Sequence, residues 1–277
     1  MSKFSKPVRV ILILVAAGFA LSVCLPEAQE TGNSASKSID YSENQQFGNI
    51  EIPAKITGKK EQIISHTGYT VSYNPAWKIP HWVAYELTKE EVEGSVPRFN
   101  AFLPDPEVLY EESATASDYS NSGWDKGHMA PAGDMKWSER AMKESFYLSN
   151  ICPQSKGLNG GIWGDLERQV REWAREKGKI YVVCGPIVPK QPKTIGANKV
   201  AIPDAFFKIL LQNKNDSWQA IAFMFANESG RNPLPAYAMS VADVQIITSI
   251  DFFPALPDSI EQKIESQVDF TKWSIRS

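Results

Sequence analysis

Two β-preferring runs joined by a short polar turn constrain the fold of this chain more than any other local pattern. The runs span residues 206–212 and 218–225, and the turn between them reads Asn213-Lys214-Asn215-Asp216. Asparagine and aspartate favour such turns because they tolerate left-handed backbone and hydrogen-bond to nearby main-chain groups. The pattern therefore predicts a hairpin, and the strands of a hairpin pair antiparallel.

Four more segments have the composition of strands. Residues 68–74 and 80–87 are rich in β-preferring side chains, and Thr88 is a candidate N-cap for the acidic turn that follows. Residues 146–151 and 180–183 are compact apolar runs, which are typical of buried central strands. Short strands joined by turns predict a mostly antiparallel sheet.

Helices are fewer than strands. The longest is predicted over residues 160–177, where apolar side chains recur at helical spacing and Gly178 provides a stop. Shorter helices are predicted over residues 138–144, 240–247 and 259–267. Strands interleaved with helices indicate an α+β domain, and 277 residues with 43% hydrophobic composition are sufficient for one such domain.

The N-terminus has the features of a leader. Basic residues among the first nine precede an uninterrupted apolar run, Val10–Val23, which is shorter than the roughly 20 residues of a membrane span. We therefore expect residues 1–24 to be a signal peptide of a protein exported from a bacterial cell, and so periplasmic, secreted or envelope-anchored. Its end, Leu21-Ser22-Val23-Cys24, resembles a bacterial lipoprotein box, so Cys24 is a possible lipid anchor; ordinary cleavage nearby is the alternative.

The segment that follows the leader is polar and poor in aromatic residues. Residues 25–60 cannot bury enough apolar surface to offset the entropy of ordering, so we expect a disordered tether there. The folded domain is then expected over residues 61–277.

Cys152 and Cys184 are the thiols certain to remain once the leader is removed. Each lies in or beside an apolar run, so adjacent strands could bring the two together, and an exported location would permit a disulfide. Two buried free cysteines are the alternative, and the sequence favours neither.

The formal net charge of the chain is −3, and removal of the basic leader would make the remainder more acidic. Nucleic-acid-binding proteins are usually basic, so the charge weighs mildly against that function. A divalent cation and a local cluster of basic side chains can still dominate the field in a cleft, because salt screens carboxylates more than about 10 Å away.

One of the three histidines stands in the distinctive run Trp124-Asp125-Lys126-Gly127-His128-Met129-Ala130-Pro131. A histidine titrates near neutrality and can take a proton from water, although a single histidine is more often structural. Further polar residues at fixed distances favour a catalytic role. They are Asn150, in Ser149-Asn150-Ile151-Cys152-Pro153-Gln154, followed by Asn159, Glu167 and Arg171.

In these segments the chain resembles the DNA/RNA non-specific endonuclease family. Its members carry an Asp-Arg-Gly-His motif, an Asn-X-X-Pro-Gln segment, and a metal-binding asparagine followed eight residues later by a glutamate. All of these recur here in order, with Lys126 in place of the usual arginine, and the resemblance extends from about Gly68 to about Ser266. It implies a central sheet flanked by helices and an active site built as a ββα-metal unit.

The resemblance also implies a role for the central residues. His128 would be the general base that activates water, and Gly127 would permit a backbone turn before it. Asn159 would bind Mg²⁺, or Mn²⁺ or another divalent cation, because an amide oxygen suits a hard ion that keeps most of its waters. Local sequence by itself favours an ordinary N-cap at Asn159, and the matched spacing favours the metal ligand.

The remaining matched residues would assist the reaction. Glu167 would orient metal-bound waters and Arg171 would contact phosphate; the simpler interpretation is an exposed ion pair on one helix face. Asn150 would help to arrange the histidine and the substrate, or would be a turn residue. Lys126 supplies a point charge where arginine would make a two-pronged contact. Arg98 matches an upstream arginine of the family, or is a surface residue.

The resemblance thus predicts a metal-dependent endonuclease that hydrolyses phosphodiester bonds in DNA and RNA. Little sequence preference is expected, because no base-reading element is evident. Family relatives often pair, which suggests a homodimer. Two alternatives stay open: a weak or inactive nucleic-acid-binding homologue, favoured by Lys126 and the acidic charge, and a phosphodiesterase with a narrower substrate range.

Overall fold

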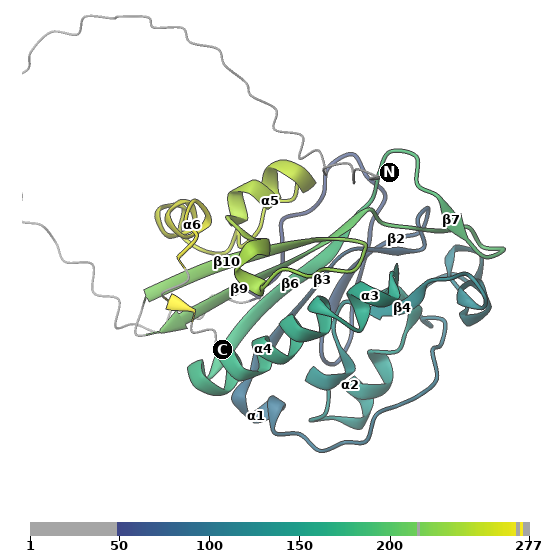
Figure 1. Ribbon diagram of the computed structural model, residues 1–277, viewed down its shortest axis with the longest axis horizontal. Coiled ribbons are helices and arrows are strands. Elements are labelled where there is room, and N and C mark those ends of the chain that lie inside the picture. Colours follow the sequence, from purple (N-terminus) through teal and green to yellow (C-terminus); the bar gives the residue numbers. More distant parts are fainter. Residues whose placement is uncertain (1–48, 215–216, 270–271, 274–277) are drawn as a thin grey trace, which may run out of the picture. The chain divides into compact units, whose positions relative to one another are not determined.

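A seven-stranded sheet lies at the centre of the computed structural model, which describes residues 49–214, 217–269 and 272–273 (Figure 1). Every neighbouring pair in it is antiparallel. The predicted hairpin is its β9–β10 pair, and the α+β class is confirmed. The strand order is β1 (Gln62–Ser65), β2 (Thr70–Asn74), β3 (Ile79–Thr88), β6 (Lys179–Ile187), β9 (Ala205–Lys214), β10 (Ser217–Ala226) and β11 (Ala238–Met239).

Helices cover both faces of the sheet, because successive side chains of each strand point into two different apolar cores. On β3, Val83 and Tyr85 belong to one core and Trp82 to the other. In Figure 1, α4 lies over one face and α5 and α6 lie over the opposite face. Their bounds are Ile162–Lys177 for α4, Val241–Thr248 for α5 and Asp258–Glu265 for α6.

The helix α4 forms because its buried side chains recur every three or four residues and make one apolar face. They include Trp163, Leu166, Val170 and Trp173. Gly178 ends the helix with a φ of 86°, which glycine adopts without a steric penalty. The predicted helix is confirmed, but it begins at Ile162 and not at Gly160. A separate turn of helix, α3 (Lys156–Asn159), precedes it.

The other elements are short. Thr88 caps α1 as predicted: its hydroxyl accepts from the Glu91 N–H at 3.2 Å, and the Glu91 carboxylate accepts from the Thr88 N–H at 2.8 Å. Two small sheets pair β4 with β5 and β7 with β8. The bounds are α1 Lys89–Val92, α2 Glu139–Glu144, β4 Asp125–His128, β5 Ile151–Gln154, β7 Thr194–Ile195, β8 Val200–Ala201, and the 3₁₀ helices η1 Tyr110–Glu112, η2 Ala116–Tyr119, η3 Ala132–Asp134, η4 Leu148–Asn150 and η5 Leu234–Tyr237.

One predicted central strand is wrong. The apolar run at residues 146–151 is buried, but it forms the 3₁₀ helix η4 before β5 begins at Ile151. Phe146 and Leu148 fill the space beside the strands without joining the large sheet. A short apolar run signals burial, and burial by itself does not distinguish a strand from another compact segment.

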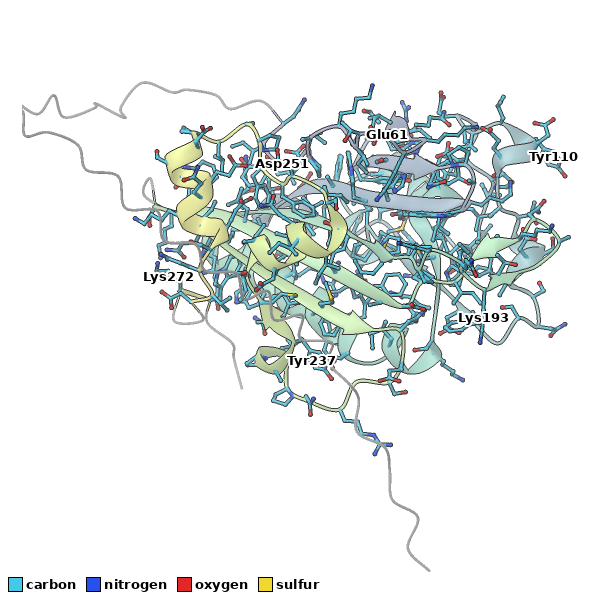
Figure 2. All side chains as sticks on the ribbon, turned by 90° about the horizontal axis from the view of Figure 1, so that it is seen from above. Glu61, Tyr110, Lys193, Tyr237, Asp251 and Lys272 are labelled. Atoms are coloured by element: carbon cyan, nitrogen blue, oxygen red, sulfur yellow. The ribbon has the colours of Figure 1, made fainter. Side chains whose placement is uncertain are left out.

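The folded part begins earlier than predicted, because residues 49–60, assigned to the tether, pack against the core. Ile50 and Ile56 are only 3% and 5% exposed. The Ala54 N–H donates to the Asp251 carbonyl at 2.9 Å, and the Ile56 N–H donates to the Glu61 carboxylate at 3.1 Å. Figure 2 labels Glu61 and Asp251, the two residues that hold this segment. The leader and the rest of the tether, residues 1–48, lie outside the described residues.

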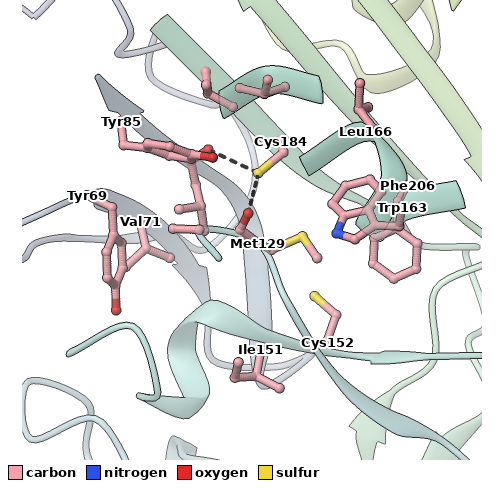
Figure 3. Packing of buried hydrophobic residues seen from close by; sticks show 14 of the residues in the cluster. Tyr69, Val71, Tyr85, Met129, Ile151, Cys152, Trp163, Leu166, Cys184 and Phe206 are labelled. Atoms are coloured by element: carbon pink, nitrogen blue, oxygen red, sulfur yellow. Dashed lines mark hydrogen bonds between the residues drawn. The ribbon is translucent and has the colours of Figure 1, made fainter. Parts of the chain in front are cut away.

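Both described cysteines are free and buried. Cys152 lies on β5 of a two-stranded sheet and Cys184 on β6 of the large sheet, and Figure 3 shows Met129 drawn between them. Burial raises the pKa of Cys152 well above its usual value and that of Cys184 to about 11, so both are protonated at neutral pH. The structure therefore agrees with the alternative of two free thiols.

Within the described ranges, no helix is both long enough and apolar enough to cross a membrane.

Ile50→Ala tests the contribution of the N-terminal segment. We expect it to lower the free energy of unfolding by about 2–4 kcal/mol, because it leaves a cavity in the core beneath α5 and α6. Ile63→Ala, at a side chain that is 51% exposed, is the matched control and should cost less than about 1 kcal/mol. Denaturant unfolding measures the free energy of unfolding of both variants. If Ile50→Ala lost no more of it than Ile63→Ala, residues 49–60 would not add the expected stability.

Candidate active site

The predicted ββα unit is present. β4 and β5 pair antiparallel from Asp125 opposite Gln154 to His128 opposite Ile151, and the chain then continues into α3 and α4 (Figure 1). A cavity of about 220 Å³ opens beside this unit. Six of the seven predicted site residues line it, together with Pro131, Ala132 and Gly133: Arg98, Lys126, His128, Asn159, Glu167 and Arg171.

His128 is held firmly and is kept neutral. Its side chain packs against Phe102 and Phe146, with ring centroids 5.4 and 4.8 Å away, and the Trp163 indole N–H donates to the His128 carbonyl at 3.3 Å. Burial, aided by the positive charge of Arg98, lowers the pKa of His128 to about 3. At neutral pH the imidazole is therefore in the form that accepts a proton.

Asn150 is the predicted site residue that does not reach the cavity. Its amide oxygen accepts from the Ala130 N–H, and its amide nitrogen donates to the carbonyls of Ala130 and Ser145, all within 2.8–2.9 Å. These bonds fix the chain just after His128. Asn150 is completely buried and does not line the cavity, so its predicted role in arranging the histidine and the substrate would act through the backbone that it holds.

Gly127 is required for a different reason from the predicted turn. It lies within β4 opposite Cys152, in extended backbone and not in a turn. A Cβ atom on Gly127 would stand 2.0–2.5 Å from the side chain of Gln154 on the facing strand. The missing side chain therefore allows the close approach of Gln154.

Asn159 ends α3 and faces Asp125 of β4. Its amide nitrogen donates to the Asp125 carboxylate at 3.1 Å, and its amide oxygen accepts no hydrogen bond from the described residues. The N-cap of α4 is Gly161, so Asn159 is not the ordinary N-cap that local sequence favours. The orientation leaves the amide oxygen available to a ligand in the cavity.

Glu167 and Arg171 are not an exposed ion pair. The Arg171 guanidinium donates to the buried Asp134 carboxylate at 2.7 Å, and the Tyr85 hydroxyl donates to the same carboxylate at 2.8 Å. Burial raises the pKa of Glu167 to about 7; the charge of Lys208 opposes that rise, and Asp134 adds to it. The two residues therefore belong to a partly buried charge cluster in the wall of the cavity.

Three basic side chains line the cavity although the whole chain is acidic. The Lys126 ammonium lies 5.2 Å from the Phe102 ring centroid, and the Arg98 guanidinium lies 5.0 Å from that of Phe146. Arg171 is the third. These cations surround the neutral His128 and suit an anionic ligand.

Sequence reasoning missed Asp134, Trp163 and Lys208. Asp134 and Arg171 are far apart in the chain, so no local pattern predicts their ion pair. Lys208 carried a usable signal. A lysine within a continuous apolar strand is expected to be buried with its neighbours, and a buried lysine is rare.

The family model for DNA/RNA non-specific endonucleases matches residues 47–259. The chain belongs to this family. Among curated relatives, the mitochondrial nuclease EXOG of Danio rerio is 38% identical over 207 residues, which cover 69% of this chain and 60% of the relative. The chain thus spans about 60% of the first relatives it matches.

Further relatives agree with this membership. Human mitochondrial nuclease EXOG is 32% identical over 263 residues, covering 89% of this chain and 70% of the relative. Bovine mitochondrial endonuclease G is 32% identical over 212 residues, covering 73% and 67%. A crystal structure of an EndoG/EndoGI complex superposes with a TM-score of 0.70 at 28% identity, covering 77% of this chain and 92% of that one.

These relatives contradict the expected location. The EXOG and endonuclease G proteins carry mitochondrial names, and they are not proteins exported from bacteria. The expectation of a periplasmic, secreted or envelope-anchored bacterial protein is therefore corrected. No finding supports a lipid anchor at Cys24, which lies outside the described residues.

His128→Gln tests the buried neutral imidazole without any substrate. The folded pKa of about 3 lies below the unfolded value near 6.5, so the unfolded state binds more protons between these values, and stability falls as the pH is lowered through this window. Between pH 7 and pH 4.5, we expect the wild type to lose about 2–3 kcal/mol more unfolding free energy than the variant.

Denaturant unfolding in EDTA at the two pH values measures this difference. Glu167 titrates in both proteins, and its raised pKa acts with the opposite sign, so the comparison with the variant isolates the histidine. Equal acid losses in the two proteins would contradict the assignment.

Proposed function

We propose that this chain is a divalent-cation-dependent endonuclease that hydrolyses phosphodiester bonds in DNA and RNA with little sequence preference. One observation carries the proposal: a neutral imidazole, an available amide oxygen and three basic side chains line the same cavity. Membership of the DNA/RNA non-specific endonuclease family supports the same reaction.

His128 is the general base in this proposal. Hydrolysis requires that a water lose a proton as it attacks phosphorus, and a neutral imidazole can take that proton. The packing of His128 against Phe102 and Phe146 restricts the ring to one orientation toward the cavity. Asn150 assists by holding the backbone that follows.

The donor groups fit a hydrated hard cation. The described residues contain no cluster of three His, Cys, Asp or Glu side chains that would cage a metal, whereas Mg²⁺ binds with few protein ligands and keeps its waters. Asn159 would hold the ion through its amide oxygen, and Glu167 would hold one of its waters. Mn²⁺ or another divalent cation would suit the same donors.

The family consists of divalent-metal-dependent nucleases. When bound, such an ion supplies positive charge to the leaving oxygen as the bond breaks.

Basic side chains would bind the phosphate itself. Asp134 fixes the Arg171 guanidinium from below, so its remaining N–H groups are free to meet a phosphate oxygen. Lys126 and Arg98 would add charge from the other rim. Contacts of this kind recognise the backbone and not the bases, which is why we expect little sequence preference.

The weak or inactive homologue is the less supported alternative, because the cavity retains the base, the amide and the cations together. The other alternative, a phosphodiesterase with a narrower substrate range, is distinguished by the cleavage test below. A homodimer stays a prediction.

His128→Ala tests the reaction. Incubated with plasmid, single-stranded DNA and RNA in Mg²⁺, the wild type should degrade all three, and EDTA should stop it. The variant should lose about 10²–10⁴-fold in turnover because it lacks the imidazole that takes the proton from water. Circular dichroism should show an intact fold. Near-normal cleavage by the variant would refute the role of His128, and cleavage of one substrate would favour the narrower enzyme.

Asn159→Ala tests the metal site. Without the amide oxygen, the Mg²⁺ concentration for half-maximal activity should rise about tenfold or more. Asn232→Ala, at an exposed loop residue outside the cavity, is the matched control and should leave the titration unchanged. Identical Mg²⁺ curves for Asn159→Ala and wild type would remove Asn159 as a ligand.

A further inference from the structure

A cavity of about 410 Å³, the Trp124 cavity, opens at the start of β4. It is larger than the catalytic cavity of about 220 Å³ that His128 lines, and no residue lines both. Trp124 stands two residues before Lys126, which lines the catalytic cavity. Two residues of extended chain span at most about 7 Å, so the Cα atoms of Trp124 and Lys126 are no further apart. The two cavities are therefore neighbours along the chain.

Asn227 ties the wall of the Trp124 cavity to the ββα unit. Its amide nitrogen donates to the carbonyls of Pro153 and Pro203 at 3.0 and 2.9 Å, and its amide oxygen accepts from the Ser155 N–H at 2.8 Å. Pro153 faces Lys126 across the β4–β5 pair, and Ser155 caps α3. The cavity therefore has a fixed place relative to the catalytic residues, as a preformed ligand site requires.

The lining suits a flat ligand with polar edges. Trp124 is half-buried, so part of its side chain packs against the core and the rest borders the cavity. Three exposed side chains also line it, Gln191, Lys193 and Asp204, and they make no hydrogen bond or ion pair with other described side chains or backbone groups. Figure 2 labels Lys193. An aromatic surface beside uncommitted donors and acceptors is typical of a ligand site.

A nucleobase has both of the properties that this lining selects. Its faces stack on aromatic side chains, and its edge carries hydrogen-bond donors and acceptors. A phosphate fits less well, because the Asp204 carboxylate adds negative charge to the lining. In the substrate of an endonuclease, the phosphate that is cut carries a nucleotide on each side, so a base necessarily lies near the catalytic cavity.

We propose that the Trp124 cavity binds an unpaired nucleobase next to the scissile phosphate, with the Trp124 ring stacked on the base. The inference rests on the proposed function. Every base has an aromatic face, so stacking adds affinity without sequence preference. A base in a duplex must first leave its pair, so the cavity favours single-stranded DNA and RNA over duplex.

Trp124→Leu keeps an apolar side chain against the core and removes the ring. Fluorescence anisotropy in EDTA, where no cleavage is expected, compares a labelled oligothymidylate with an abasic oligonucleotide of equal length and charge. Wild-type protein should bind the oligothymidylate about 5–100-fold more tightly, and Trp124→Leu should bind the two within about twofold of each other.

Two further variants complete the binding test. Trp124→Phe retains an aromatic ring and should keep most of the preference for the oligothymidylate. Trp218→Leu, at another half-buried tryptophan, is the matched control and should bind like wild type. Trp218 packs in the core beneath α5 and α6, on the face of the sheet opposite α4.

Cleavage gives a second readout. The KM of Trp124→Leu for single-stranded DNA should rise about 5–100-fold with kcat within about twofold of wild type, because the ring contributes to binding and takes no part in proton transfer. Cleavage of duplex plasmid should change less. Equal losses on single-stranded DNA and plasmid would contradict the preference for an unpaired base.

Three binding results would overturn the proposal: no preference for the oligothymidylate in wild type, a preference that Trp124→Leu retains, or one that Trp124→Phe loses. Failure of both Trp124 variants to fold, seen by circular dichroism, would assign the ring to the core and also defeat it. The binding assay requires no turnover. A wild type that prefers the oligothymidylate but cleaves no nucleic acid would therefore defeat the proposed function alone.

Discussion

The burial of Trp163 is the interaction on which the rest of the site depends. Its ring packs against Phe206 and Phe225 of the sheet, and its N–H reaches the backbone of β4. One side chain thus joins the large sheet, the helix α4 and the strand that carries His128. Because α4 is fixed in this way, Glu167 and Arg171, one and two turns further along, face the cavity and not solvent.

Local chemistry made much of the fold predictable. The β9–β10 hairpin and α4 follow from turn residues and from apolar spacing, which act over a few residues. The run at 146–151 lacks a period, so its burial was predictable and its 3₁₀ form was not. The packing of residues 49–60 could not be foreseen, because it involves partners about 200 positions away, such as Asp251, whose carbonyl accepts from the Ala54 N–H.

The site, too, combines features that the sequence predicts with features that depend on distant contacts. The resemblance to the family indicated which polar residues belong together, and β4, α3 and α4, which lie close together in the sequence, bring most of them to the cavity. It did not predict what lies beneath them: Asp134 and Lys208 reach the site from separate elements. The basic side chains of Arg98, Lys126 and Arg171 in the cavity lining reconcile an acidic chain with the proposed binding of an anion, since the field there is set by neighbours within a few ångströms.

The two buried thiols have a consequence for the environments in which this domain can stay folded. Burial raises the pKa of both thiols, so they stay protonated at neutral pH, and no disulfide bond links the described strands. Glutathione and other cellular reductants therefore have no disulfide bond to reduce among the described residues. The fold of the domain is compatible with both reducing and oxidising compartments.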